Sequence, residues 1–249
     1  MLSIIVVNYN SGDSLERTFH ALNKIVIQPQ IELIVIDGGS SDISLNIINS
    51  NRNTIDKFIC EPDKGIYDAM NKGIGFVTGT WVWFVNAGDI PLIDASTCIE
   101  LLNTAHCKEY NYIYSDVSIS GFIIKQNSSL KFLMHKMLNH QSCIYRNYLL
   151  DGGYDISYRY CADYAHLLSV WSNIRSIKAN PILCEYDITG VSSIISRKRR
   201  LTIWLERFRA QLNSSLPIPV KIVFLIFSLI VIFIKIINPS AGSIKNKLS

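Results

Sequence analysis

Charge is scarce in this sequence and unevenly placed. Charged residues make up 18% of the 249 residues against 49% hydrophobic residues, which excludes a disordered chain and favours contact with a membrane. The formal net charge of +4 is concentrated in a basic segment at 197–209, beside the longest apolar run. Such a segment favours anionic lipid over nucleic acid as a partner. The length allows one large domain, with or without appended segments, and a sizeable core.

Three familiar signals are missing. The six cysteines form no CxxC pair and have no histidine at metal-site spacing, so we expect buried thiols in a reducing compartment instead of disulfides or zinc ligands. The N-terminus lacks a basic region and a cleavage site, which predicts no signal peptide and a main domain on the cytoplasmic face of the inner membrane. The first apolar run is not followed by a Gly-rich basic phosphate loop, which argues against nucleotidyl transfer.

Short apolar, β-branched runs alternate with helical patterns in the N-terminal part. Strands are expected at 3–7, 31–36, 57–60 and 80–85. This alternation predicts βαβ units and an α/β fold, with a Rossmann-like, mostly parallel sheet flanked by helices.

The helices between these strands have their own signals. Asp13 or Ser14 is expected to cap the first helix, and Ile43, Ile47 and Ile48 are expected to point inward from the second. A third helix is expected to begin near Asp68.

Polar residues follow three of the strands, at Asn8, Asp37 and Glu61. An aspartate after a strand often only forms a turn, but ligands of open parallel sheets bind beyond the carboxyl ends of the strands. The fourth strand ends in the NAGD segment at 86–89. A carboxylate there suits a metal-bridged diphosphate, because hard cations take oxygen ligands and share them with phosphates.

The following segments predict further elements. Helices are expected at 91–102 and 130–138 and from Tyr158 through Trp171, a hairpin around Gly121, and a last strand at 182–186. His140 follows the second of these helices. A lone histidine is commonly structural, and Asp163 in a first helical turn is favoured by the helix dipole alone, so a structural role stays open for both.

Six stretches together resemble family 2 glycosyltransferases of the GT-A fold, in particular bacterial surface-polysaccharide (colanic-acid-type) enzymes. They are SIIVVNYN at 3–10, ELIVIDGGSSD at 32–42, EPDKGIYDAMNKGI at 61–74, WFVNAGD at 83–89, HQSCIYR at 140–146 and ADY at 162–164. The resemblance implies that the nucleotide of a donor is bound by Asn8, Tyr9, Asn10, Asp37, Asp63, Lys72 and Asn86.

The same resemblance implies the remaining roles. Asp89 would bind a divalent metal, Mg2+ or Mn2+, in place of the family's Asp-x-Asp motif, in which Gly88 stands where a carboxylate is common. His140 would lie beside the donor diphosphate or the acceptor. Asp163 would be the catalytic base, in a motif that usually reads Glu-Asp and here reads Ala-Asp. Met70 stands where the family commonly has arginine.

The resemblance therefore implies an inverting hexosyltransferase. It would move a sugar from a nucleotide-sugar donor to a lipid-linked saccharide in surface-polysaccharide synthesis, and a UDP-sugar is the donor that we expect. The weakened metal motif leaves open an alternative, a nucleotide-binding, membrane-anchored partner subunit without turnover.

The C-terminal part has a different character. Residues 197–212 predict a basic amphipathic helix whose apolar face, with Leu201, Trp204 and Leu205, suits a membrane surface. An apolar run at 222–234 follows, and it either spans the membrane or lies in its plane. We expect a catalytic domain at 1–195 and a membrane-associated tail at 196–249.

Overall fold

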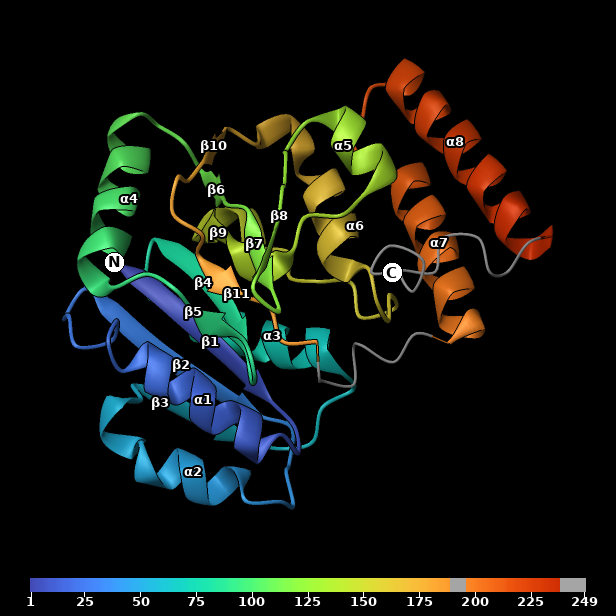
Figure 1. Cartoon of the computed structure of the whole chain (residues 1–249). Helices are drawn as coiled ribbons and strands as arrows, with labels where there is room; N and C mark the ends of the chain where they lie inside the picture. The colour runs from blue at the N-terminus through green and yellow to red at the C-terminus, as the bar shows by residue number, and fades with distance from the viewer. Residues whose placement is uncertain (189–195, 238–249) are drawn as a thin grey trace. The chain divides into compact units, whose positions relative to one another are not determined.

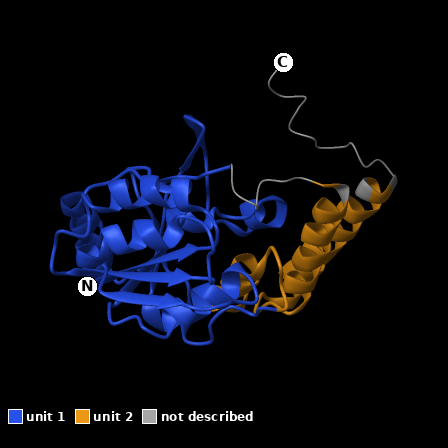
Figure 2. Cartoon of the chain, turned by 90° about the horizontal axis from the view of Figure 1, so that it is seen from below, with its two compact units in different colours: residues 1–156, 173–193 blue, residues 157–172, 194–249 orange. Residues whose placement is uncertain are grey.

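The structure is a computed structural model and describes residues 1–188 and 196–237 (Figure 1). The chain forms two compact units (Figure 2). Unit 1 comprises residues 1–156 and 173–193, and unit 2 comprises residues 157–172 and 194–249. The predicted division between 195 and 196 stays a prediction, and the unit that contains the tail also includes the helix that begins at Ala162.

Unit 1 is built on a seven-stranded sheet in the order β10-β6-β9-β4-β1-β2-β3. Its strands are β1 (Leu2–Asn8), β2 (Ile31–Asp37), β3 (Lys57–Cys60), β4 (Trp81–Asn86), β6 (Tyr112–Tyr114), β9 (Cys143–Arg146) and β10 (Ser176–Lys178). The pairs β1–β2, β1–β4, β2–β3 and β6–β10 are parallel, and only β9 runs antiparallel to its neighbours in this sheet. The prediction of a mostly parallel sheet is confirmed, and the carboxyl ends of β1 to β4 share one edge.

A smaller sheet has the order β5-β11-β7-β8. It contains β5 (Ile90–Pro91), β7 (Val117–Ile119), β8 (Phe122–Ile124) and β11 (Cys184–Glu185). The predicted hairpin forms between β7 and β8, where Gly121 takes a φ of +79°. The predicted last strand is present but reduced to two residues.

Helices alternate with these strands along the chain of unit 1. They are α1 (Gly12–Leu22), α2 (Ser44–Ser50), α3 (Ile66–Ile74), α4 (Ala95–Cys107) and α5 (Leu130–His135), with 3-10 turns η1 (Arg52–Thr54), η2 (His140–Ser142), η3 (Asn147–Leu150) and η4 (Trp171–Asn173). Alternate strand residues such as Ile4 and Val35 form one apolar core with Phe19 of α1. On the opposite face α3 approaches closely, since a Cβ on Gly73 would lie 2.6 Å from Ile5 Cγ2.

Several local predictions are wrong. Helix α1 begins at Gly12, so Asp13 and Ser14 lie within its first turn, and the Gly12 amide instead donates to the Asp42 carboxylate. Ile43 precedes α2 and is exposed. Helix α4 begins only at Ala95, where Asp94 accepts a hydrogen bond from the Thr97 amide.

Other segments differ because pairing with distant residues decides their structure. Residue 91, expected in the helix, instead forms β5 together with residue 90 because the two pair with β11. The helix that contains Asp163 ends at Ser169, before Trp171. No disulfide joins the six cysteines, all of which lie in the described ranges, and Cys60 and Cys107 are exposed where buried thiols were expected.

Unit 2 contains α6 (Ala162–Ser169), α7 (Arg197–Leu212) and α8 (Ile218–Ile237). Helix α7 has the predicted bounds, but its Leu205 is exposed, and Trp204 packs on Phe227 of α8 at 6.4 Å between ring centroids. In α8, Phe224, Ser228 and Ile232 are buried. The helix also exposes Ile222, Val223, Ile226, Leu229, Ile230 and Phe233. Within the described ranges, the structure contains no helix with the length and apolar character needed to cross a membrane.

Candidate active site

The carboxyl ends of β1 and β2 are joined by a buried polar network. Asn8 Nδ2 donates to Asp37 Oδ1 at 2.7 Å and to Ser40 Oγ at 3.2 Å, and Ser40 Oγ donates to Asp37 Oδ1 at 2.6 Å. The amides of Gly39 and Ser40 and the thiol of Cys60 donate to Asp37 Oδ2. Two predicted site residues, Asn8 and Asp37, are therefore brought together, and Asp37 fixes the loop that follows β2.

Asp37 is held as a carboxylate. Burial acts to raise its pKa, but the hydrogen bonds from Ser40, Asn8 and Cys60 outweigh it and lower the pKa below the ordinary value. A charged acceptor at the end of a buried strand is thus preformed. Its bonds within the protein explain its position, and its contact with a nucleotide stays a prediction.

Two further predicted residues converge on Gly38. A Cβ at Gly38 would collide with Asp63 Oδ2 and would lie 3.2 Å from Tyr9 Cδ2, so these two side chains flank the glycine. Tyr9 is 60% exposed, and Asp63 accepts a hydrogen bond from the Gly65 amide. Asn10 takes a left-handed φ of +47° and accepts a hydrogen bond from the Ser41 amide. The exposed ring beside a carboxylate is a suitable surface for a base and a ribose.

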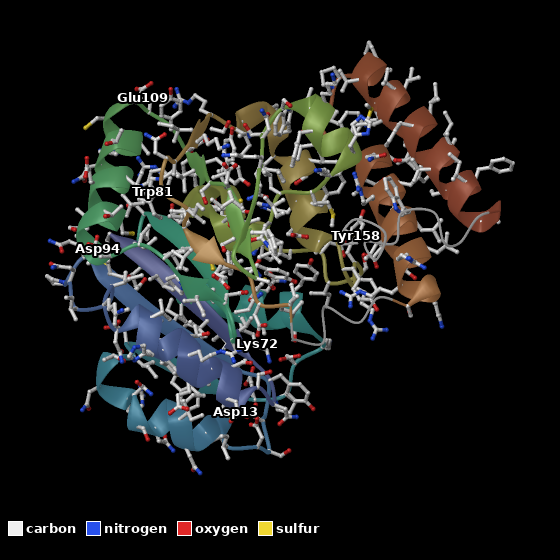
Figure 3. All side chains as sticks on the ribbon, viewed as in Figure 1. Asp13, Lys72, Trp81, Asp94, Glu109 and Tyr158 are labelled. Atoms are coloured by element: carbon white, nitrogen blue, oxygen red, sulfur yellow. The ribbon has the colours of Figure 1, made fainter. Side chains whose placement is uncertain are left out.

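Lys72 lies on α3 (Figure 3), and its ammonium is engaged with acidic partners. Its ammonium is 2.9 Å from Glu61 Oε1 and donates to the Pro62 carbonyl at 2.8 Å. The hydrogen bond with Glu61 raises the pKa of Lys72. Met70, where the resemblance has arginine, is buried.

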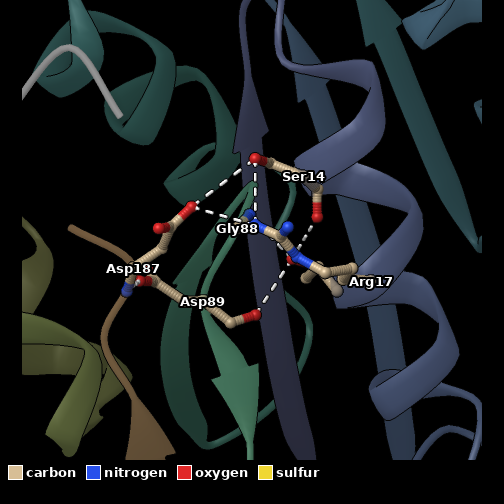
Figure 4. Close-up of polar contacts among 6 residues, drawn as sticks. Ser14, Arg17, Gly88, Asp89 and Asp187 are labelled. Atoms are coloured by element: carbon tan, nitrogen blue, oxygen red, sulfur yellow. Dashed lines mark hydrogen bonds and ion pairs between the residues drawn. The ribbon is translucent and has the colours of Figure 1, made fainter. Parts of the chain in front are cut away.

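The NAGD segment contacts Asp187, a residue that is distant in the sequence but belongs to the same unit (Figure 4). Asp89 Oδ1 accepts a hydrogen bond from the Asp187 amide, and Asp89 Oδ2 accepts one from the Asn86 amide, both at 3.0 Å. Gly88 has a φ of +105°, and a Cβ there would collide with Asp187 Oδ2. The carboxylate of Asp187 therefore occupies the space beside Gly88 where a side chain would stand.

These two carboxyl groups have different surroundings. Asp89 is 2% exposed, and burial, together with the negative charge of Asp187, raises the pKa of Asp89 to about 7 against the effect of the two amide bonds. Asp187 Oδ2 lies 3.4 Å from the Arg17 guanidinium and accepts a hydrogen bond from Ser14 at 3.5 Å. The site thus pairs a deeply buried carboxyl with one that faces a cation from α1.

His140 lies in an aromatic cluster. Its ring centroid is 4.7 Å from that of Phe84 and 5.6 Å from that of Tyr145, and its Nε2 lies 2.7 Å from the Tyr154 hydroxyl. Asn71 holds the backbone of Tyr154 through two hydrogen bonds, at 2.7 and 2.8 Å. The surroundings of His140 agree with the structural role left open by the sequence, and a contact with the diphosphate stays a prediction.

Asp163 belongs to unit 2, in the first turn of α6, as expected. It is partly buried. Cys161, which precedes α6, supplies no side-chain cap.

A cavity in unit 1 lies apart from the predicted site residues. It has a volume of about 900 Å³ and is lined by Arg17, Lys24, Leu92 and Asp94 among others, and no predicted site residue lines it. Among the described residues, no three His, Cys, Asp or Glu side chains are grouped as for a metal ion. Asn86 Oδ1, beside Asp89, is buried and has no hydrogen-bond partner in the described part of the chain.

Sequence reasoning missed two residues that organise this edge. Ser40 joins the β1 and β2 loops, and its place in the DGGSS turn was a usable signal. Asp187 lies 98 residues from the Asp89 carboxylate that its amide contacts, and no local motif marks it.

Polar residues at the carboxyl ends of the strands, at one edge of a mostly parallel sheet, stand where α/β proteins of this class bind their ligands. Residues 3–115 match the family model "Glycosyl transferase family 2". The chain is also 30% identical over 201 residues to an uncharacterized glycosyltransferase of Mycobacterium tuberculosis H37Rv, covering 77% of each chain. The chain belongs to glycosyl transferase family 2.

A further relative is also a glycosyltransferase, and solved structures show a similar fold. A PGL/p-HBAD biosynthesis glycosyltransferase of Mycobacterium tuberculosis H37Ra is 29% identical over 215 residues, covering 81% of this chain and 82% of the relative. Among solved structures, S. aureus TarS in complex with UDP-GlcNAc has a TM-score of 0.74 at 18% identity, covering 100% of this chain and 76% of that one. The Pyrobaculum calidifontis mannosyltransferase PcManGT, with GDP-Man and Mn2+, has a TM-score of 0.64 at 14% identity, covering 97% and 76%. At such identities these structures support the GT-A-like fold alone.

Proposed function

We propose that this protein is an inverting glycosyltransferase that moves a sugar from a nucleotide-sugar donor, UDP-linked in the first instance, to a hydroxyl of a lipid-linked saccharide. The observation that carries the proposal is the convergence of Asn8, Asp37, Asp63 and Tyr9 at the strand ends, on the same edge of the sheet where β4 ends and Asp89 contacts Asp187. The names of two relatives support it, since TarS is shown with UDP-GlcNAc and a mycobacterial relative acts in PGL/p-HBAD biosynthesis.

In the proposed reaction, the acceptor oxygen attacks the anomeric carbon from the face opposite the leaving group. A bond forms between that oxygen and the anomeric carbon, the bond to the phosphate oxygen breaks, and its electron pair leaves with the nucleoside diphosphate. Asp163 takes the proton of the acceptor hydroxyl as general base. This single displacement needs no covalent enzyme intermediate.

The residues beside the NAGD segment fit a divalent cation. The carboxylates of Asp89 and Asp187 and the partnerless Oδ1 of Asn86 are all oxygen donors, which Mg2+ and Mn2+ prefer. When bound, such a cation would stabilise the negative charge of the departing diphosphate. Asp187 then supplies the second carboxylate that Gly88 cannot, and PcManGT, shown with Mn2+, supports this part of the proposal.

The lipid-linked acceptor is proposed from unit 2. The row of exposed apolar side chains on α8 from Ile222 to Phe233 is available to acyl chains, and Lys198 and Arg199 of α7 bring positive charge that suits anionic headgroups. We therefore place the protein at the cytoplasmic face of the cell membrane, in surface-polysaccharide synthesis.

A donor panel tests the proposal. Purified full-length protein is incubated with UDP-, GDP- and dTDP-sugars and a polyprenyl-linked saccharide, and nucleotide release is measured with and without a chelator. We expect release with one nucleotide class and its loss on chelation. Absence of release with every donor from folded protein would contradict the proposal.

The second candidate is a nucleotide-binding partner subunit without turnover, which the single carboxylate of the NAGD segment favours. It predicts a thermal shift with a nucleotide donor but no transfer in the same panel. Transfer that is lost in Asp163→Asn, with donor binding retained, would exclude it.

A further inference from the structure

One carboxylate on the basic helix α7 holds the chain segment that leads into α6. Glu206 Oε1 accepts a hydrogen bond from the Arg159 amide at 2.9 Å, and Glu206 Oε2 accepts hydrogen bonds from the amides of Tyr160 at 2.9 Å and Cys161 at 3.0 Å. All these groups lie in unit 2. Three backbone donors on one charged acceptor is an arrangement with strong, directional bonds.

The segment held in this way directly precedes Asp163. Cys161 is the N-cap residue of α6 and makes no capping bond with its own side chain. A capping residue normally satisfies amides at the start of its own helix, and here Glu206 fixes the approach to the helix from a different element. Cys161 Sγ also donates to the Ile203 carbonyl of α7 at 3.6 Å.

Three arginines of α7 make cation–π contacts with tyrosines of the same stretch. Arg209 lies over the ring of Tyr158 at 3.9 Å, Arg199 over Tyr160 at 4.7 Å and Arg207 over Tyr164 at 5.1 Å. These cation–π contacts extend from before the Glu206 bonds to the residue after Asp163. The contacts are therefore spread along the whole stretch that presents Asp163.

We infer that Glu206 is a positioning residue for Asp163. The inference rests on the proposed role of Asp163 as the base that takes the acceptor proton. Glu206 touches neither the acceptor nor the donor in this account and acts through the backbone of residues 159–161. Through Glu206, α7 would help to hold the catalytic base in place, a role separate from the proposed contact with the membrane. Since a shift of about 1 Å in a catalytic group can cost roughly a hundredfold in rate, the loss of this support should be visible in kcat.

Glu206→Gln is the decisive variant. It keeps the volume of the side chain but replaces one acceptor oxygen by an NH2 group, which faces at least one backbone N–H and cannot accept from it. We expect kcat for sugar transfer to fall by roughly ten- to a hundredfold, with KM and binding affinity for the donor unchanged. Faster hydrogen exchange at the amides of residues 159–161 would accompany the loss.

Thr202→Val is the matched control. It lies one turn before Glu206, is close to isosteric, and removes only a hydroxyl that donates to the Lys198 carbonyl within α7. We expect it to leave kcat unchanged. An equal loss in Thr202→Val would attribute the effect to α7 stability in general and would overturn the inference.

A double variant separates the positioning role of Glu206 from the proposed role of Asp163 as the base. If Glu206 acts only through Asp163, Glu206→Gln causes no further loss of transfer in an Asp163→Asn background. An additional loss of the same factor overturns the positioning role. Parental kcat in Glu206→Gln, while Asp163→Asn is inactive, overturns the inference but leaves the proposed function intact. Parental kcat in Asp163→Asn overturns the proposed base and the inference with it.

Discussion

At the scale of single residues, Gly88 connects the sequence to the site. It stands in the segment where a second acidic residue is common in the family, and Asp187 brings a carboxylate into the space left by its missing side chain. The local motif predicted Asp89 as a site residue but not Asp187, because a contact across 98 residues leaves no trace in spacing. The glycine at position 88 leaves room for the Asp187 carboxylate, and that carboxylate lies where the family's acidic side chain would stand.

Replacing Gly88 tests this packing. In Gly88→Ala the Cβ would collide with Asp187 Oδ2 and sit on a backbone with a φ of +105°. We expect a loss of about 1–3 kcal/mol in the free energy of unfolding, measured in urea, and a lower rate of transfer. Gly121→Ala is the control, since its φ of +79° is also left-handed but its Cβ would meet no atom within 4 Å. Equal losses in the two variants would contradict the close approach of Asp187.

At the scale of elements, ion pairs around the buried carboxyl group of Asp116 connect the two sheets of unit 1, while the side chains of Lys125 and Lys178 are 81% and 40% exposed. Asp116, between β6 and β7, lies 2.6 Å from the ammonium of Lys178 on β10 and 3.0 Å from that of Lys125. It also accepts a hydrogen bond from the Gln126 amide. Burial acts to raise the pKa of Asp116, but these partners outweigh it and lower the pKa to about 2.

The lowered pKa gives a pH-dependent stability. Since the pKa of Asp116 in the folded protein lies below the ordinary value of 3.8, the stabilising contribution is present above that value and is lost as the pH falls through about 2. We expect Asp116→Asn to cost about 2 kcal/mol at pH 7 and little near pH 2, measured by urea unfolding. Glu109→Gln, at an ion pair with Arg175 whose side chains are 76% and 59% exposed, is expected to cost little at either pH. A cost for Asp116→Asn that is equal at both values would refute the ion-pair explanation.

Helix α7 shows what an amphipathic pattern can predict. Its bounds and basic character follow from the sequence, but the pattern does not say what covers its apolar face. The sequence assigned that face to a membrane, whereas in the structure Trp204 packs on Phe227 of α8. Leu205 of α7 stays exposed, and α8 carries more of the exposed apolar side chains that are available to a lipid surface.

That assignment has a direct test. In Ile226→Asp with Leu229→Asp, carboxylates replace two exposed apolar side chains of α8, so we expect binding to vesicles with anionic phospholipid to fall at least tenfold in a flotation assay. Ile27→Asp, at a similarly exposed apolar residue of unit 1, is expected to bind as the parent does. Parental binding by the double variant would show that α8 does not face the lipid.

At the scale of the whole molecule, order along the chain was enough to predict the parallel half of the large sheet. Strands β1, β2 and β4 are buried apolar runs that end in a polar residue, β3 is shorter and only partly buried, and each strand is separated from the next by helical sequence. Strand β9 was missed because its CIYR sequence becomes a strand only by antiparallel pairing between β4 and β6. Contacts between residues far apart in the sequence also form β5 and the hydrogen bonds of Glu206 with residues 159–161. Local sequence patterns therefore predict the loops at the strand ends better than the distant residues that hold such segments in place.

The central claim, that this family 2 member transfers sugar with Asp163 as the base, is tested most directly by sugar transfer in Asp163→Asn. Transfer to a polyprenyl-linked saccharide and donor affinity are measured side by side in the parent, in Asp163→Asn and in Asp151→Asn, a control at an exposed carboxylate. We predict that Asp163→Asn loses roughly 10²- to 10⁴-fold in kcat at unchanged donor affinity, while Asp151→Asn matches the parent. Parental turnover in Asp163→Asn would contradict the account.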